Sequence, residues 1–209
     1  MKINEPKIVG GELVRLEDVE NETTVRAFKF VGNSEKNLCL SEICFEECTF
    51  EDINFNSIYL KNCDFIDVVF KNCDLSNKTF NERFFNRVEF IDCKFVGTSF
   101  IETTFKDVRW KNVHSKYVNF SDAKLEGVVF ENAELVNAVF METKMKRVDF
   151  LKVDFTESEF FRTPLAGIDL SSCDISGVKF DFLSLKGITI SIYQCPKLVS
   201  MLGVKIADE

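Results

Sequence analysis

The residues of this 209-residue chain with the clearest capacity for chemistry are its eight cysteines and its single histidine. Cys39, Cys44 and Cys48 lie close together, and closely spaced thiolates can hold zinc. Their spacing contains no C-x-x-C pair, and a fourth ligand is missing because the only histidine is the distant His114. We therefore predict no metal site and no cofactor, and expect most of these thiols to pack as small apolar groups.

Catalysis is not predicted either. His114 has no Ser or Cys at an obvious catalytic spacing, and the sequence contains no Gly-rich phosphate loop or zinc-protease motif. Asp recurs in units such as Cys63-Asp64-Phe65, where its carboxylate suits hydrogen bonding to neighbouring backbone at a turn. This repetition indicates a structural role, so we predict that the protein is not an enzyme.

The charge balance limits the class of partner. The chain has 26 Lys and Arg against 34 Asp and Glu, a net charge of −8, which disfavours direct binding of nucleic acid and suits a basic protein partner. The N-terminus lacks the apolar segment of a signal peptide, and no apolar run is long enough to span a membrane. We expect a cytoplasmic protein with reduced cysteines and no membrane contact.

A five-residue period explains most of the 23 phenylalanines. The 31 positions that are multiples of five, from Leu40 to Ile190, hold 18 Phe, eight Leu, two Ile, and one each of Trp, Met and Ser. The residue two positions earlier is mostly small or β-branched, as at Val108 and Ala123. A period of five fits neither a helix nor a flat strand. It predicts a backbone that turns every five residues and directs two side chains of each unit inward.

Four such units make a square coil of 20 residues, and stacked coils lie about 4.8 Å apart, the spacing of paired strands. Residues 38–192 then form about eight coils, each of which buries its centre only against its neighbours. The predicted fold class is all-β, a quadrilateral β-helix with a short C-terminal helix. The predicted division is an N-terminal β cap at 1–37, the solenoid at 38–192, and a helix and tail at 193–209.

Units such as Ala133-Glu134-Leu135-Val136-Asn137 and Cys173-Asp174-Ile175-Ser176-Gly177 resemble those of the pentapeptide repeat family. The resemblance covers about three quarters of the chain and implies a right-handed β-helix. In the Qnr-type (quinolone-resistance) subgroup, a negatively charged rod engages the DNA-binding saddle of DNA gyrase and topoisomerase IV. Enterobacterial members carry loops that interrupt the repeat, whereas this chain has no insertion between 40 and 190.

Residues 20 apart stack on one face of such a coil, which predicts two surface features. The first, the acidic ladder, comprises Glu82, Glu102, Asp122 and Glu142; the second, the apolar strip, comprises Ile101, Met141 and Phe161. Like charges on neighbouring coils repel, so stability alone does not select them, although a screened face that maintains solubility is the simpler alternative.

We predict that the ladder and strip contact a protein partner. The resemblance points to a DNA mimic that binds a type II topoisomerase and modulates quinolone susceptibility. The alternative function is a structural or scaffolding module that binds an unrelated protein.

The C-terminal segment 193–202 is predicted to be helical, because Pro196 suits a first turn and Gly203 a stop. Its apolar side chains are Leu198, Val199, Met201 and Leu202. In the Qnr-type subgroup such a helix joins two solenoids end to end, so we expect a homodimer through these residues. The alternative is a helix that only plugs the last coil.

Two places depart from the repeat. Lys78 and Arg83 occupy inward positions, and because a buried unpaired cation is costly we expect the segment Ser76–Arg87 to bulge and leave Phe84 unusually exposed. Ser115 leaves a gap in a column of large side chains close to Trp110, which neighbouring bulk or a buried water would fill.

Overall fold

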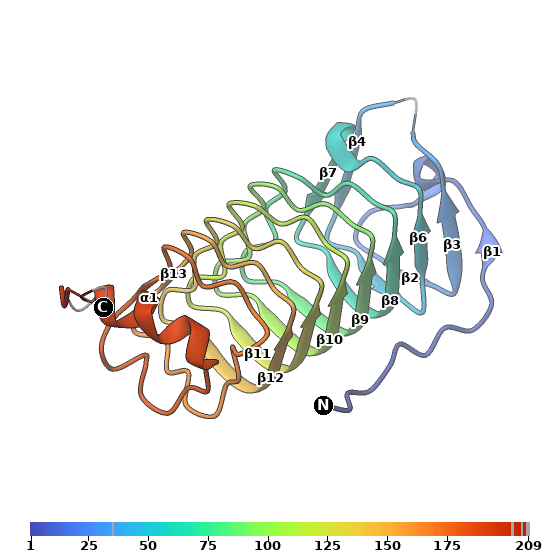
Figure 1. The fold of residues 1–209 in the computed structure, drawn as a ribbon. Coiled ribbons are helices and arrows are strands. Elements are labelled where there is room, and N and C mark those ends of the chain that lie inside the picture. The colour runs from blue at the N-terminus through green and yellow to red at the C-terminus, as the bar shows by residue number, and fades with distance from the viewer. Residues whose placement is uncertain (35, 202, 206, 208–209) are drawn as a thin grey trace.

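The computed structural model describes residues 1–34, 36–201, 203–205 and 207. In this part of the chain nearly all regular structure is short strands, with one α-helix at the C-terminal end (Figure 1). The strands are β1 (Glu12–Leu13), β2 (Thr24–Arg26), β3 (Phe28–Val31), β4 (Leu38–Ser41), β5 (Cys44–Glu46), β6 (Thr49–Glu51), β7 (Ile58–Lys61), β8 (Asp64–Lys71), β9 (Phe84–Ile91), β10 (Thr104–Lys111), β11 (Lys124–Glu131), β12 (Lys144–Leu151), β13 (Glu159–Phe160) and β14 (Lys179–Phe180). The helices are the 3₁₀ segments η1 (Leu16–Asp18), η2 (Phe55–Ser57) and η3 (Ile192–Gln194), and α1 (Cys195–Met201).

The predicted solenoid is confirmed: the chain forms a parallel β-solenoid of about eight turns. Strands pair in parallel at a register of 20 residues, as in Phe65↔Phe85 and Phe85↔Phe105. A residue with positive φ stands at a corner every five residues, for example Glu102 at +57° and Asp107 at +52°. The left-handed conformation is costly for most side chains, so the inter-coil hydrogen bonds and the buried core must stabilise these corners.

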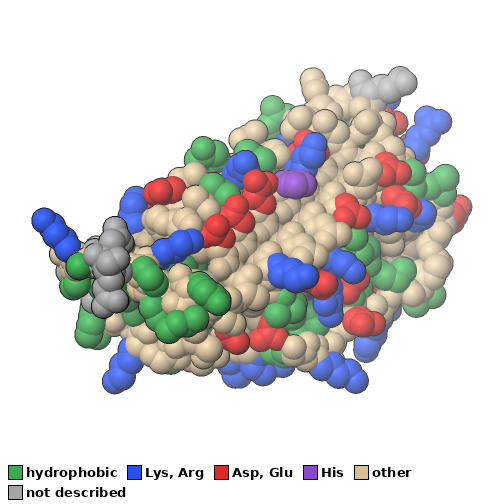
Figure 2. Space-filling view, in the orientation of Figure 1, with side chains coloured by type: hydrophobic (Ala, Val, Ile, Leu, Met, Phe, Trp, Pro, Cys, Tyr) green, Lys and Arg blue, Asp and Glu red, His purple; other side chains and the backbone are tan. Residues whose placement is uncertain are grey.

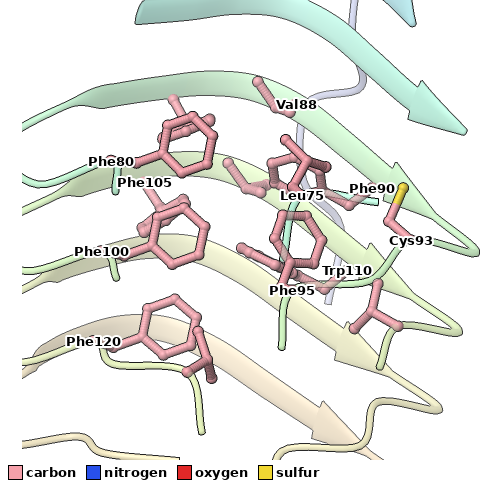
Figure 3. Close-up of a cluster of buried hydrophobic side chains, with 14 of the residues drawn as sticks. Leu75, Phe80, Val88, Phe90, Cys93, Phe95, Phe100, Phe105, Trp110 and Phe120 are labelled. Atoms are coloured by element: carbon pink, nitrogen blue, oxygen red, sulfur yellow. The ribbon is translucent and has the colours of Figure 1, made fainter. Parts of the chain in front are cut away.

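The core consists of columns of large side chains, most of them aromatic rings. Phe80 stacks on Phe100 with 5.3 Å between ring centroids, and Phe100 stacks on Phe120 at 5.4 Å (Figure 3). Rings of adjacent columns meet edge to face, as do Phe100 and Phe105. Both arrangements are favourable for aromatic quadrupoles, so a single side-chain type can fill the rod with little loss of packing.

The 20-residue register extends into the segment predicted as an N-terminal cap. Strand β2 pairs with β5 through Thr24↔Cys44, and β3 pairs with β6 through Phe30↔Phe50. Before β1, residues 1–10 form an extended segment, the N-terminal arm, that runs back along the outside of the solenoid below β8 to β11 (Figure 1). The pairs β2–β5 and β3–β6 at the N-terminal end therefore already have the geometry of the repeat.

The C-terminal helix covers the last turn. The side chain of Gln194 is buried and donates from Nε2 to the backbone oxygens of Leu170 (2.9 Å) and Cys173 (2.8 Å). Ser191 and Gln194 form a capping box at the start of η3, and Leu198 packs against the core. Two carbonyl groups of the final coil, which have no following coil to bond, are satisfied in this way.

The predicted bulge at Ser76–Arg87 is wrong, although the segment is irregular. Its hydrogen bonds to the following coil are regular, for example Asn77 N to Val96 O at 2.8 Å, and Phe84 is only half-exposed within β9. The irregularity lies on the side that faces the preceding coil. Within the described chain, no backbone hydrogen bond or bridge joins residues 57–63 to 77–83. Strand β7 consequently pairs only with β4. The large side chains of Lys78 and Arg83 separate two coils instead of bending one.

The gap predicted at Ser115 is filled by neighbouring bulk. The ring of Trp110 lies 4.7 Å from Phe95 and 4.4 Å from Phe90, closer than its distance to Phe130 (5.6 Å) (Figure 3). Trp110 and Ser115 are both completely buried. The larger indole thus occupies part of the volume that the small serine leaves. Of the two predicted alternatives, this arrangement agrees with filling by neighbouring bulk.

Candidate functional site

The acidic ladder occupies one corner of four successive coils. Each of its residues has positive φ, between +53° and +61°, and is exposed. The backbone N–H of Glu82 donates to Ile101 O (2.8 Å), and that of Asp122 donates to Met141 O (2.8 Å). Since every ladder residue holds the same place in its coil, the side chains leave the rod in one row, about 4.8 Å apart along its axis.

Three of the four ladder carboxylates are free. Among the described residues, Glu82, Glu102 and Asp122 have no side-chain hydrogen bond and no ion pair. Glu142 differs, because Arg162, the next residue of the same column, donates from Nη1 to its Oε1 at 2.6 Å. The structure therefore places the four predicted residues together but leaves an unneutralised row of only three.

Several charges elsewhere are compensated between coils. The ion pairs that join positions 20 residues apart include Lys71–Glu51, Arg87–Asp67, Arg109–Glu89, Lys146–Glu126 and Lys179–Glu159. In another corner column, Asn72 donates to Asp52 and Asn112 donates to Asp92. Cross-coil pairing of this kind is the arrangement that stability favours. Within the described chain, Glu82, Glu102 and Asp122 lack such pairing.

The apolar strip runs beside the ladder, one residue earlier in each coil. Met141 is 38% exposed, whereas Ile101 and Phe161 are half-buried. The same column also contains Asn81, whose Oδ1 accepts from the N–H of Ile101 at 3.0 Å, and Ser121. The strip is therefore interrupted and partly polar. On the adjoining face, Lys124 and Lys144 are exposed, so the acidic row has cations close to one side.

His114 does not form a catalytic group with its neighbours. Its Nδ1 lies 3.0 Å from Oε2 of Glu134, whose other oxygen is 2.9 Å from Nζ of Lys116. Burial works to raise the pKa of Glu134, but the hydrogen bonds from His114 and Lys116 outweigh it and hold that pKa below its usual value. Figure 2 shows the histidine on a face where acidic and basic side chains are mixed.

The cysteines have the packing role predicted for them. All eight are free thiols, and five of them are fully buried: Cys48, Cys63, Cys73, Cys93 and Cys173. Burial raises the pKa of Cys63 to about 11, so its thiol is neutral at physiological pH. In the part of the chain that is described, no group of three or more His, Cys, Asp or Glu residues is arranged to hold a metal ion.

The C-terminal end exposes apolar side chains other than those predicted for dimerisation. Leu198 packs against the core and Val199 is half-buried, while Leu202 and the side chain of Met201 lie outside what the structure describes. The exposed group, here called the end patch, consists of Phe182 (77% exposed), Leu183 (78%), Ile192 (74%) and Tyr193 (88%). Sequence reasoning missed it, because Phe182 and Leu183 lie out of phase with the repeat.

The geometry of the described residues defines the fold class as a parallel β-solenoid with four corners in each 20-residue turn. A family model described as "Pentapeptide repeat region" matches residues 63–140, and one described as "Pentapeptide repeats (8 copies)" matches residues 39–77. Residues 39–140 thus match pentapeptide repeat models, as the sequence resemblance indicated. No curated protein sequence matches it significantly.

The solved structure of HetL agrees with this fold. HetL, a pentapeptide repeat protein involved in heterocyst differentiation regulation from the cyanobacterium Nostoc sp. strain PCC 7120, is 14% identical, with a TM-score of 0.51 over 81% of this chain and 90% of HetL. Full-length QnrB1, a plasmid-mediated fluoroquinolone resistance protein, is 19% identical over 94% of this chain and 97% of its own, with a TM-score of 0.39. A pentapeptide repeat protein of the Arabidopsis thaliana thylakoid lumen is 23% identical over 41% of this chain and 60% of its own, with a TM-score of 0.40. The described residues contain no helix long and apolar enough to cross a membrane.

Proposed function

We propose that this protein is a non-catalytic binding protein that presents the acidic ladder to a basic, DNA-binding surface of a protein partner. The observation that carries the proposal is the row of Glu82, Glu102 and Asp122, three exposed acids on successive coils of one corner column, none of which forms an ion pair within the described chain. The carboxylates of the ladder are about 4.8 Å apart along the rod, and the phosphates of a single DNA strand are about 3.4 Å apart along the helix axis, so the two charge spacings are of similar size. Complementary charge of this kind speeds and orients docking.

The partner to test first is a type II topoisomerase, DNA gyrase or topoisomerase IV. The support for this choice is the sequence resemblance to the Qnr-type subgroup together with the acidic ladder. The expected consequence is modulation of quinolone susceptibility. Because the interaction is electrostatic, binding is expected to weaken steeply as ionic strength rises.

The test is a DNA gyrase supercoiling assay with and without ciprofloxacin. We expect the wild-type protein either to inhibit supercoiling or to protect it from the drug, and the triple variant Glu82→Gln/Glu102→Gln/Asp122→Asn to lose the effect. A matched control removes three exposed acids elsewhere, Glu20→Gln/Glu22→Gln/Glu157→Gln, and keeps the same net charge as the test variant. No effect of the wild type at micromolar concentration, or equal loss in both variants, contradicts the proposal.

We further propose that two copies associate through the end patch, which gives a longer rod. Four large apolar side chains, each more than 70% exposed at one end of the chain, support an interface there. Sedimentation velocity is expected to show a dimer for the wild type and a monomer for Phe182→Ser/Tyr193→Glu. A monomeric wild type removes this part of the proposal and leaves the ladder untouched.

A second function, a scaffolding module for an unrelated protein, is favoured by the same end patch if that patch binds another protein instead of a second copy. A wild type that is monomeric and inactive on gyrase, with a stable partner lost on the Phe182→Ser/Tyr193→Glu change, selects it.

A further inference from the structure

The seam between residues 57–63 and 77–83 originates in two side chains of the wrong size for their positions. In the column of Lys78 the neighbours are Ile58 and Thr98, and both are fully buried. In the column of Arg83 the neighbours are Cys63 and Thr103, also fully buried. A Lys or Arg does not fit the volume that a threonine or cysteine fills, so the two coils separate at this face.

Thr98 and Thr103, which occupy the same columns in the next coil, show which hydrogen bonds the seam lacks. Thr98 donates from Oγ1 to Leu75 O at 2.8 Å, and Thr103 donates from Oγ1 to Phe80 O at 2.5 Å. Each bond ties one coil to the coil before it. Within the described residues these ties are missing at the seam, and so are the backbone hydrogen bonds between residues 57–63 and 77–83. Natural proteins depart from their own structural rules chiefly at functional sites, where the lost stability has a use.

The two cations remain inside the opening and keep free donors. Lys78 donates from Nζ to Asn56 O at 3.3 Å, and its ammonium lies 5.5 Å from the centre of the Tyr59 ring. Arg83 donates from Nε to Asn81 O at 3.1 Å. Within the described chain its two terminal NH₂ groups make no hydrogen bond or ion pair. These groups therefore face the opening with unused hydrogen-bonding capacity.

The opening is a cleft of about 630 Å³, within the usual range for small-molecule sites. Its walls include the cations Lys61, Lys78 and Arg83 and the amides Asn62 and Asn81, with Tyr59 on one side, and they include no carboxylate. Acids at neighbouring positions are engaged or exposed: Asp64 accepts from Phe84 N, Asp74 accepts from Ser76 N, and Glu42 and Glu82 are exposed corner residues. Three cations without an acid are unusual on a protein with a net charge of −8.

We propose that this cleft binds a small phosphorylated ligand. Lys78 and Arg83 hold the phosphate, Lys61 adds charge at the mouth, and the Tyr59 ring and the asparagine amides contact the rest of the molecule. A phosphate group matches the site because it carries up to two negative charges and enough oxygens for several N–H donors at once, and arginine binds it in a bidentate manner. The proposal does not depend on the acidic ladder or on any protein partner.

The experiment titrates the full-length protein, at constant ionic strength, with inorganic phosphate, AMP, adenosine and acetate. One readout is the unfolding temperature. The other is the alkylation rate of Cys39, an exposed cysteine in the cleft wall, followed by peptide mass spectrometry so that the other thiols do not interfere. At about one hundred times its Kd, AMP is expected to raise the unfolding temperature by about 5–10 °C and to slow Cys39 alkylation by about tenfold or more.

The decisive variant is Lys78→Thr/Arg83→Thr, which installs at both columns the residue found in the next coil. Without ligand it is expected to unfold at a higher temperature than the wild type, and AMP and phosphate should no longer change either readout. The control Lys124→Thr/Lys144→Thr removes two exposed cations elsewhere and should keep the full response. A response that survives in the cleft variant, equal responses to AMP and adenosine, or no response of the wild type to any phosphorylated probe overturns the proposal.

Discussion

The side chain of Asn4 donates a hydrogen bond of 2.7 Å to Oδ2 of Asp107, a residue 103 positions further along the chain. Lys7, three residues after Asn4, donates its backbone N–H to Oδ1 of Asp67 at 2.9 Å. Three extended residues span about 10 Å, and two coils span about 9.6 Å, so the N-terminal arm contacts every second coil of one corner column. The arm therefore ties together coils that are far apart in sequence, and its own residue Ile3 is buried.

If the arm stabilises the rod, Asn4→Ala is expected to lower the free energy of unfolding by about 1 kcal/mol, because the buried carboxylate of Asp107 loses its amide donor. Urea denaturation measures this. Lys2→Ala, at an exposed position on the same arm, serves as the control and should change little. Equal effects of the two substitutions would argue that the arm contributes no specific contact.

Acid is expected to weaken the attachment at Asp67. Burial works to raise the pKa of Asp67, but hydrogen bonds from the Arg87 guanidinium and from Lys7 N outweigh it and hold that pKa below its usual value. An unfolded Asp has a pKa of about 3.9, so the stabilisation is complete above about pH 4 and is lost as pH falls through the lower pKa of the folded state. The difference in unfolding free energy between wild type and Asp67→Asn should therefore be largest near neutral pH and shrink in strong acid. A difference that does not change with pH contradicts this assignment.

The packing of Trp110 against Ser115 predicts strong coupling between the two positions. In the neighbouring coils these positions hold Phe90 with Phe95, and Phe130 with Leu135. Trp110→Phe leaves a cavity and Ser115→Leu overfills the site, so each is expected to lose about 1–3 kcal/mol of stability. The double variant restores the regular pattern and should be markedly more stable than the sum of the two single changes predicts. Additive losses in the denaturation cycle would show that the two side chains do not share a volume.

The ion pair between Glu142 and Arg162, at the end of the acidic ladder, gives a further prediction. Breaking it is expected to strengthen the interaction with gyrase, whereas removing ladder carboxylates is expected to weaken it. Arg162→Ala frees Glu142 and lengthens the unpaired row from three carboxylates to four. Binding to gyrase, measured by surface plasmon resonance at low salt, is expected to tighten by about two- to fivefold, the effect of one exposed charge. Arg26→Ala, which breaks the exposed Arg26–Glu47 pair at the other end of the rod, removes the same charge and should have little effect. Equal tightening in both variants would indicate a response to net charge alone.

Gln194 is expected to hold the last turn closed. Gln194→Leu removes one of the two donors to Leu170 O, which still accepts from Cys173 N, and removes the Nε2 donor to Cys173 O, which costs about 1–3 kcal/mol. Hydrogen exchange should accelerate across residues 165–190 and remain unchanged near the centre of the rod. Lys197→Ala, which breaks exposed contacts to Asp174 and Ser176, provides the comparison.

The five-residue repeat of the sequence by itself determined most of the fold. Large side chains at every fifth position leave one arrangement in which all of them are buried together, and the 20-residue stacking follows from four corners in each turn. That stacking also placed Glu82, Glu102, Asp122 and Glu142 correctly in one row, because column membership depends only on residue number.

Tertiary structure decided which members of a column are free and where the rule fails. The sequence alone marked Lys78 and Arg83 as misfits, but whether a misfit bends its own coil or separates two coils depends on the packing of both neighbours. The arm on Asp67 and Asp107 and the exposed end patch have no periodic signal either. A period constrains only those contacts that every coil repeats, and contacts made once by a side chain or an end segment depend on the assembled rod.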